Sequence, residues 1–252
     1  MNIILLGSGN VATHLGKAFK SVNHKILQVW SRNFEHALVL AEELGAAYTS
    51  DISSVLPDAD LYVVSVSDDH IADVVRSFPH SDKILVHTSG STEMDIRGIS
   101  GVFYPLQTFS KHAKVDFDRI PIAVEAIDQG IESCLFALAQ SIGSKPFILN
   151  SEQRKALHVA AVFACNFTNH LYNVANGILQ NQKLSFDLIR PLIDETARKV
   201  QNRLPSEVQT GPAIRNDQKI LDKHLHFLQG DQTLADLYDK LSQSIINFNQ
   251  KA

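Results

Sequence analysis

The first third of the chain alternates short apolar runs with amphipathic segments. Runs with the composition of buried strands occupy residues 2–6, 26–30, 47–49, 61–66 and 83–87. Between them, apolar residues recur at three- and four-residue spacing, which predicts helices over residues 11–19, 37–44 and 71–78. Gly45 is expected to end the second of these helices. Such alternation predicts a parallel sheet whose strands are joined by right-handed helical crossovers.

The pattern between residues 90 and 150 is less regular but still contains strands. Short strands are expected at 101–104, 122–125 and 145–149, and a helix at 131–142. Because these segments follow the alternating part directly, we expect them to extend the same sheet. Residues 1–150 are therefore predicted to form a doubly wound parallel α/β domain, the Rossmann arrangement.

Beyond residue 150 the pattern is helical throughout. Ser151 is expected to cap a long helix that runs past Tyr172, with Glu152 in its first turn. A second helix covers 186–200, and Pro191 within it either kinks that helix or marks its start near Arg190. Two more helices are expected to begin at Pro212 and to span 234–248. Residues 151–252 are thus predicted to form a smaller all-helical domain.

The turn after the first strand carries a recognisable pattern. Gly7, Gly9 and Ala12 form Gly-x-Gly-x-x-Ala between a strand and a helix. In this context Gly7 permits the tight turn, and Gly9 lets the backbone approach a pyrophosphate that the helix N-terminus attracts. The alternative is an ordinary strand-to-helix turn. We favour a dinucleotide site made by Gly7, Ser8, Gly9, Asn10 and Val11.

The end of the second strand bears on which dinucleotide would bind. In such folds a carboxylate at this position selects NAD by bonding the ribose 2′-hydroxyl. Here the position holds Ser31 and Arg32, whose hydroxyl and guanidinium suit a 2′-phosphate instead. The sequence therefore favours NADP over NAD. If Arg32 is only a solvated loop residue, the choice stays open.

Polar loops follow the strands that end near residues 66 and 87. Since ligands of open parallel sheets lie beyond the carboxyl ends of the strands, Val66, Ser67 and Ser89 are expected to line the nicotinamide end. Asp68 and Asp69 resemble a carboxylate pair for acid–base chemistry. We favour the simpler interpretation that one of them caps the following helix.

Polar residues interrupt the apolar helix that opens the second half. At 3.6 residues per turn, His158 and Asn169 share one stripe, and Asn166 is displaced from it by roughly a quarter turn. One interpretation makes His158 a proton donor or polariser, with Asn166 and Asn169 orienting a substrate. The other is a hydrogen-bonded polar layer between helices or across a dimer interface. The sequence leaves both open.

Two further segments are candidates for the substrate side. Thr210 and Gly211 precede Arg215, which is suited to clamp a carboxylate. A surface helix start, with Arg215 and Asp217 in solvent, explains the same residues equally well. Gln107, in the loop after the strand at 101–104, is also assigned to the substrate side.

Composition excludes several classes of function. A net charge of −4 provides no basic field for nucleic acid or an anionic membrane. Two cysteines, Cys134 and Cys165, are too few for a disulfide framework or a zinc site, and no other metal-ligand spacing is seen. The N-terminus lacks the pattern of a signal peptide, and no apolar run is long enough to cross a membrane. We expect a cytoplasmic protein without a metal.

Taken together, these motifs resemble the Rossmann-like oxidoreductases of the 6-phosphogluconate-dehydrogenase-like superfamily. Pyrroline-5-carboxylate reductase and the deazaflavin-dependent NADP reductases are similar in the N-terminal half. The whole chain is most similar to a bacterial family of largely uncharacterised oxidoreductases that join this domain to a helical one. The resemblance implies a homodimer in which the helical domain closes the active-site cleft. It rests on residues 7–12, 31–33, 64–69, 86–91, 104–109, 158–166 and 210–212.

The chain departs from that superfamily at one position. Many of its dehydrogenases place a catalytic lysine four residues before an asparagine, but Lys155 is followed by Val159, and Asn166 is preceded by Val162. Two hypotheses follow. The first is an NADP-dependent oxidoreductase that reduces a C=O or C=N group of a small metabolite, with His158 in place of the lysine. The second is a non-catalytic NADP(H)-binding dimer that acts as a sensor or scaffold.

Overall fold

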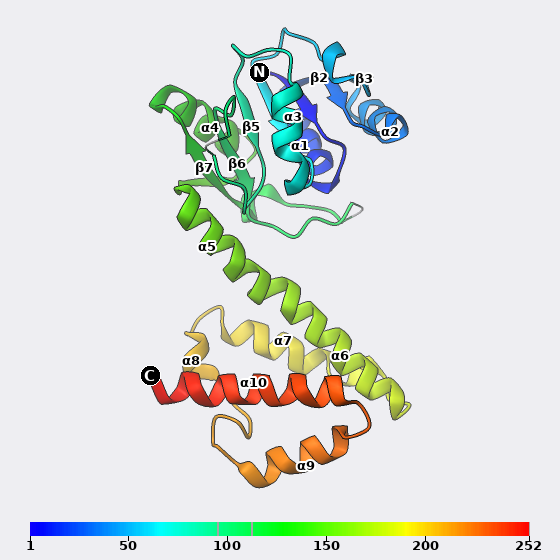
Figure 1. The fold of residues 1–252 in the computed structure, drawn as a ribbon, viewed down its shortest axis with the longest axis vertical. Coiled ribbons are helices and arrows are strands. Elements are labelled where there is room, and N and C mark those ends of the chain that lie inside the picture. Colours follow the sequence, from blue (N-terminus) through cyan, green and yellow to red (C-terminus); the bar gives the residue numbers. More distant parts are fainter. Residues whose placement is uncertain (95, 112, 252) are drawn as a thin grey trace. The chain divides into compact units, whose positions relative to one another are not determined.

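The computed structural model describes the chain except for Asp95, His112 and Ala252, and it describes side chains as far as Asn249. The chain forms two compact units, Met1–Leu171 and Tyr172–Ala252. The first unit contains the sheet and is drawn from blue to green in Figure 1. The change from strands to helices falls at residue 150, where it was expected. A domain boundary at that residue stays a prediction.

The first unit is built on one eight-stranded sheet of order β3-β2-β1-β4-β5-β6-β7-β8. The strands are β1 (Asn2–Leu6), β2 (Lys25–Trp30), β3 (Ala47–Thr49), β4 (Leu61–Val64), β5 (Leu85–His87), β6 (Gly101–Pro105), β7 (Pro121–Ala126) and β8 (Lys145–Ile148). The predicted doubly wound Rossmann-type sheet followed by helices is confirmed, and the segments after residue 100 do extend the same sheet.

One part of the sheet departs from the parallel arrangement. The strands from β3 to β6 are mutually parallel, whereas β7 pairs with β6 in the antiparallel sense and β8 is parallel to β7. Among the described residues between β6 and β7, the structure has the 3₁₀ turn Phe117–Arg119 and no crossover helix. Antiparallel neighbours need no such helix, so the chain returns beside β6 in the opposite direction.

Helices cover both faces of this sheet, as Figure 1 shows. They are α1 (Asn10–Ser21), α2 (Phe34–Leu44), α3 (Ile71–Ser77) and α4 (Gln129–Ser141). On one face, α1, α2 and α4 pack against a core that contains Phe19 and Phe103; on the other, α3 packs near Tyr62. Gly45 ends α2 in the left-handed conformation with φ of 70°, as its sequence position predicts.

A continuous helix from Ser151 to Asn181 leads out of the sheet. It comprises α5 (Ser151–Ala161), a π-helical segment (Val162–Phe167) and α6 (Thr168–Asn181). The long helix is confirmed, but its predicted cap is wrong. The Asn150 side chain accepts from the backbone N–H of Gln153, whose own side chain accepts from the N–H of Asn150. This capping box makes Ser151 the first helical residue, since asparagine caps as well as serine.

The π-helical segment changes the geometry that we inferred from the sequence. Regular 3.6-residue spacing placed His158 and Asn169 on one stripe, but a π turn contains an extra residue and rotates everything after it. The prediction of a single stripe through Asn169 therefore does not hold. The hydrophobic pattern of the sequence does not indicate this insertion.

The second unit is helical, as expected. It begins within α6, and after the 3₁₀ turn Phe186–Leu188 come α7 (Arg190–Lys199), α8 (Pro205–Val208), α9 (Gln218–Leu228) and α10 (Gln232–Lys251). Pro191 lies in the first turn of α7, so the helix begins at Arg190 rather than being kinked. The start predicted at Pro212 is wrong. Asp217 caps α9 by accepting from the N–H of Ile220, and Asn216 before it is left-handed with φ of 50°.

In the part of the chain that the structure describes, no helix combines the length and apolar character needed to cross a membrane.

Candidate active site

The turn between β1 and α1 has the shape that a bound pyrophosphate needs. Gly7 has φ of 138°, and a Cβ built on it would lie 2.2 Å from the backbone oxygen of Ser65. A Cβ on Gly9 would meet nothing within 4 Å, so open space lies above the start of α1. The first turn of that helix carries no acidic residue. An open, unopposed helix N-terminus attracts phosphate, so these residues fit a dinucleotide.

The other residues of the turn connect it to its neighbours. The Ser8 hydroxyl donates to the Ser31 hydroxyl at 2.9 Å, and the Asn10 amide donates to the backbone oxygen of Phe109 at 2.8 Å. Val11 is partly buried against the core. The glycine turn therefore touches both the end of β2 and the loop after β6.

The residues expected to choose the cofactor lie where β2 ends. Ser31 is buried and bonded to Ser8, whereas the Arg32 side chain is exposed. Asn33 caps α2 by accepting from the N–H of His36. The Ser31 hydroxyl thus lies next to the glycine turn, and Arg32 follows it in the chain, at the end of the strand where a carboxylate would favour NAD.

The loops after β4 and β5 lie at the same edge of the sheet. Val66 is partly buried against the core, Ser67 is exposed, and the Ser89 hydroxyl accepts from the N–H groups of Ser91 and Thr92. Neighbouring parallel strands place both loops where the nicotinamide end was predicted.

The capping role predicted for Asp68 or Asp69 is wrong. Neither the 3₁₀ turn Asp68–His70 nor α3 has a side-chain cap. The carboxylate of Asp68 instead accepts a hydrogen bond from the Ser91 hydroxyl, which joins the two loops. The aspartates lie inside the turn rather than before it, so their carboxylates are not placed to reach its first N–H groups.

Beside these loops, Tyr104 and His158 form a hydrogen-bonded pair. The Tyr104 hydroxyl, from the end of β6, lies 3.0 Å from Nδ1 of His158 on α5. Gly90 packs directly against both rings. A Cβ there would lie 2.6 Å from Nδ1 of His158 and 2.7 Å from Cζ of Tyr104. The backbone after β5 approaches this closely because residue 90 has no side chain.

The surroundings of Tyr104 keep its phenol protonated. Burial raises the pKa of Tyr104 above its ordinary value of 10, and the charges of Asp68 and Cys165 raise it further, while Arg154 opposes them. At neutral pH the hydroxyl is therefore available as a proton donor. Tyr104 could not be recognised from the sequence as a site residue, because it lies near the end of an apolar strand and looks like a core residue there.

Arg154 is the largest fully buried side chain among the described residues, and the sequence did not point to it either. Its guanidinium donates to the carboxylate of Glu125, to the Ser151 hydroxyl and to the backbone oxygens of Ser89 and Thr92. Charged residues on a helix are usually exposed, so the sequence gives no reason to expect Arg154 in the site. Its spacing of four residues from His158, which puts both on one helix face, is the one feature that could have indicated it.

The remaining predicted site residues are exposed. Asn166 lies within the π-helical segment, and Asn169 follows in α6. The Gln107 side-chain oxygen accepts from the N–H of Thr108 at 2.8 Å. Thr210 and Arg215 belong to the second unit, where they precede α9. Among the predicted catalytic residues, His158 is the one that the structure places against the sheet edge, where it contacts Tyr104 and Gly90.

His87, at the end of β5, is a buried neutral histidine. Its Nδ1 accepts from the N–H of Ser89 at 3.2 Å, and its Nε2 has no hydrogen-bond partner among the described residues. Burial lowers the pKa of His87 to about 4, with Arg154 contributing, while the Glu93 backbone and Asp68 act in the opposite direction. The ring thus supports the Ser89 backbone rather than exchanging protons.

This depressed pKa makes folding stability depend on pH. Between the ordinary value of 6.5 and about 4, the unfolded chain takes up a proton that native His87 refuses, so stability falls as pH falls through this window. The full loss amounts to about 3 kcal/mol. His87→Asn keeps an acceptor for Ser89 but does not titrate. Urea unfolding at pH 7.5 and 4.5 should show a smaller acid-induced loss in the variant. Equal losses would contradict the assignment.

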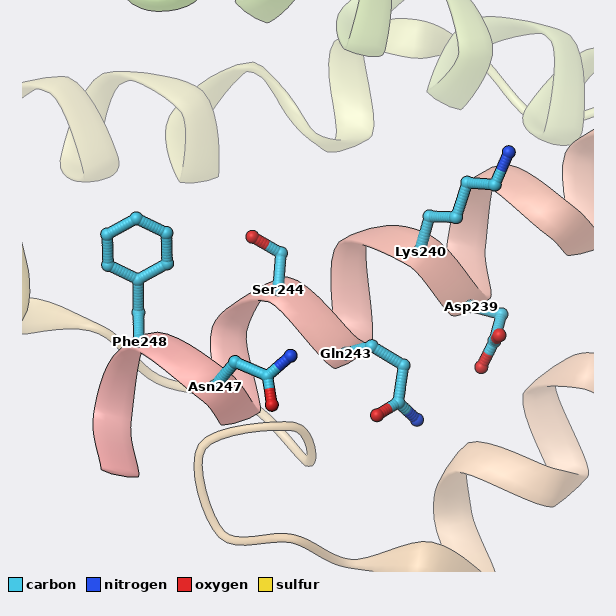
Figure 2. A pocket seen from close by; sticks show the side chains of 6 residues that line it. All are labelled: Asp239, Lys240, Gln243, Ser244, Asn247 and Phe248. Atoms are coloured by element: carbon cyan, nitrogen blue, oxygen red, sulfur yellow. The ribbon is translucent and has the colours of Figure 1, made fainter. Parts of the chain in front are cut away.

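A hollow of about 440 Å³ lies along α10 in the second unit. In Figure 2, Lys240, Ser244 and Phe248 point to one side of this helix, while Asp239, Gln243 and Asn247 point to the other. These side chains do not converge on one point, and Phe248 is 77% exposed. We assign no chemistry to this hollow. Across the described residues, no three His, Cys, Asp or Glu side chains gather in a metal-binding arrangement.

Comparison with known proteins now adds to this geometry. Residues 2–90 match the family model described as NADP oxidoreductase coenzyme F420-dependent, and residues 120–245 match the Domain of unknown function (DUF2520). The chain belongs to the family that joins these two parts, an NADP-binding N-terminal domain and a DUF2520 C-terminal domain. A search of functionally curated proteins found no match.

Solved structures agree with this assignment. A protein from Bacteroides fragilis, described as a putative NADP oxidoreductase, is 43% identical over 98% of both chains, with a TM-score of 0.89. An imine reductase from Myxococcus stipitatus in complex with NADP+ is 17% identical, covers 100% of this chain and 94% of its own, and has a TM-score of 0.66. A 1-pyrroline-5-carboxylate reductase from Streptococcus pyogenes is 13% identical over 98% of both chains, with a TM-score of 0.64. The last two share the fold. The predicted resemblance is therefore confirmed.

Proposed function

We propose that this protein is an NADP-dependent reductase of a C=N or C=O group in a small metabolite. The observation that carries the proposal is the Tyr104–His158 pair, which lies against Gly90 at the sheet edge that also carries the glycine turn. A buried, protonated phenol there is suited to protonate a product. The proposal places the protein in the cytoplasm, as the sequence led us to expect.

In such a reduction, Tyr104 and His158 have different roles in proton transfer. When bound, NADPH supplies the hydride that adds to the carbon of the C=N or C=O group. Tyr104 donates its hydroxyl proton to the nitrogen or oxygen, and Nδ1–H of His158 stabilises the resulting phenolate. Nε2 of His158 takes up a proton from solvent, to which the ring is partly open, as Nδ1 passes its proton to the phenolate, so Tyr104 regains its hydroxyl and the imidazole stays neutral. General acid catalysis of this kind contributes typically 10²- to 10⁴-fold.

Relatives suggest which bond is reduced. The similar folds described as imine reductase and 1-pyrroline-5-carboxylate reductase support a C=N substrate, so cyclic imines are the first compounds to test. NADPH oxidation should be followed with cyclic imines, keto acids with and without amines, and deazaflavin and flavin analogues. Turnover of a cyclic imine above the rate without protein supports the proposal. Tight NADPH binding without turnover of any compound would favour the second candidate, a non-catalytic NADP(H) sensor or scaffold.

The preference for NADPH over NADH tests the role proposed for Arg32 at the end of β2. Arg32→Ala removes the guanidinium proposed to bind the 2′-phosphate, so NADPH affinity should fall about tenfold or more while NADH affinity changes little. The measurement is a fluorescence titration of both nucleotides with both proteins. Lys25→Ala, at the opposite end of β2, is the control for loss of a positive charge. Equal NADPH affinity in wild type and Arg32→Ala would overturn the 2′-phosphate assignment.

We also propose that the protein is a homodimer formed through its helical part. Val159, Phe163, Phe167 and Leu171 are 36% to 65% exposed along the long helix, which is costly in water. Among the residues of the second unit whose burial the structure describes, the buried hydrophobic ones are Ala213, Leu221, Leu228 and Ala235, a small core for its length. A second copy, as the family resemblance implies, would cover these surfaces. A mass near 56 kDa, about twice that of one chain, is expected by light scattering, and a monomer would contradict the proposal.

A further inference from the structure

The buried guanidinium of Arg154 joins three parts of the first unit. Its Nη1 donates to the backbone oxygens of Ser89 at 3.0 Å and Thr92 at 2.7 Å. Its Nη2 donates to Glu125 and to the Ser151 hydroxyl, each at 3.0 Å, and its Nε donates to Glu125 at 3.4 Å. The Arg154 side chain is 1% exposed and that of Glu125 13%. One side chain thus ties α5 to β7 and to the Ser89–Thr92 loop.

The hydrogen bonds of Arg154 lie on both sides of Gly90, the residue that packs against the Tyr104–His158 pair. Arg154 and His158 are four residues apart on α5, so they lie on the same face of the helix. Arg154 binds the carbonyl groups of Ser89 and Thr92, on either side of Gly90, while His158 packs against Gly90 itself. The two side chains together hold the Ser89–Thr92 loop against α5.

We propose that Arg154 is a positioning residue, whose guanidinium holds the Ser89–Thr92 loop so that Gly90 stays against the Tyr104–His158 pair. The effect on turnover rests on the reductase proposed above, whereas the effect on the pair's geometry does not. A planar guanidinium reaches two carbonyls and a carboxylate at once, which an ammonium cannot do.

The charge of Arg154 supports the same role. It acts on Tyr104 by lowering the pKa of that phenol, against the stronger effect of burial. It also contributes to keeping His87 neutral, and neutral His87 accepts from the Ser89 N–H in the same loop. Arg154 therefore acts on the loop directly by hydrogen bonds and indirectly through the charge state of His87.

Stability alone does not require this ion pair. Buried ion pairs can often be replaced by apolar residues without loss of stability, whereas removing one partner leaves an uncompensated buried charge. The double variant R154M/E125L should therefore recover much of the stability that R154M loses. Structural and positioning roles then predict different results: a structural role predicts that activity returns with stability, and a positioning role predicts that it does not.

The test compares wild type, R154M, R154K, R154M/E125L and the control K155M, whose exposed ammonium lies 3.9 Å from Glu93. We expect R154M/E125L to unfold near the wild-type urea midpoint and to bind NADPH within threefold of wild type. The kcat of R154M/E125L should fall at least tenfold, with a smaller change in KM. R154K should also have a reduced kcat, because an ammonium cannot replace the guanidinium. K155M should behave as wild type. Wild-type kcat in R154M/E125L would overturn the proposal.

A second readout needs no substrate. The ¹⁵N signals of the His158 ring report its hydrogen bond to Tyr104, with Tyr104→Phe as the reference for a broken bond. In R154M/E125L these signals should move toward the Tyr104→Phe positions, and in K155M they should stay. Unchanged signals in R154M/E125L would overturn the proposal even if no substrate is found. Shifted signals with no turnover in wild type would leave Arg154's positioning role supported and count against the reductase.

Discussion

Tyr104→Phe is expected to lower the rate of NADPH-dependent reduction by about 100- to 10,000-fold, the usual contribution of a general acid. The substitution removes the hydroxyl that lies 3.0 Å from His158 and leaves the ring that packs against Gly90. NADPH affinity should change less than threefold, because the hydroxyl is not proposed to hold the dinucleotide. Single-turnover NADPH oxidation, with substrate saturating, measures the chemical step directly.

Tyr62→Phe provides a matched control for this prediction. Tyr62 is another buried tyrosine of the same sheet, and its hydroxyl donates to the backbone oxygen of Leu56 at 2.7 Å. Its loss should lower stability by about 1 kcal/mol and leave the reduction rate unchanged. If Tyr104→Phe and Tyr62→Phe reduce substrate at similar rates, the phenol is not the proton donor.

Gly9→Ala is expected to weaken NADPH binding at least tenfold without unfolding the protein. The backbone of Gly9 is extended, with φ of −77°, and an added Cβ meets no protein atom within 4 Å. A methyl group there occupies only the open space proposed for the pyrophosphate. Stability should therefore stay within about 1 kcal/mol of wild type.

Gly7→Ala is the matched contrast in the same turn. Its φ of 138° strains any other residue, and the added Cβ would lie 2.2 Å from the Ser65 oxygen. We expect a loss of about 3 kcal/mol or more from strain and clash together. Urea unfolding separates the two variants, and NADPH titration is then made on Gly9→Ala. If Gly9→Ala binds NADPH with wild-type affinity, the pyrophosphate does not bind at this turn.

Local patterns were enough to predict most of the sheet and the glycine turn. The strands and helices of the first unit follow from apolar runs and helical periodicity, and Gly45 ends α2 because only a left-handed residue suits that cap. These features depend on neighbours within a few residues of the chain. The same local reasoning predicted a helix start at Pro212, but α9 begins at Gln218, after the cap formed by Asp217.

The Tyr104–His158 pair depends on contacts that no local pattern contains. Its two members lie 54 positions apart in the chain, and Arg154 binds Ser89 across 65. A buried arginine looks like a solvated helix residue until the fold brings carbonyl groups to it. The apolar spacing of the helix likewise does not reveal the π-helical segment, which is why the predicted stripe through Asn169 failed.

The central claim is that a nicotinamide cofactor delivers its hydride beside Tyr104. The most direct measurement is a crystal structure of the protein with NADP+. We predict the pyrophosphate at Gly9 and the start of α1, the 2′-phosphate at Arg32, and the nicotinamide ring beside Gly90 within reach of the Tyr104 hydroxyl. A nicotinamide ring bound away from Gly90 and Tyr104, or a dinucleotide that avoids the glycine turn, would contradict the account.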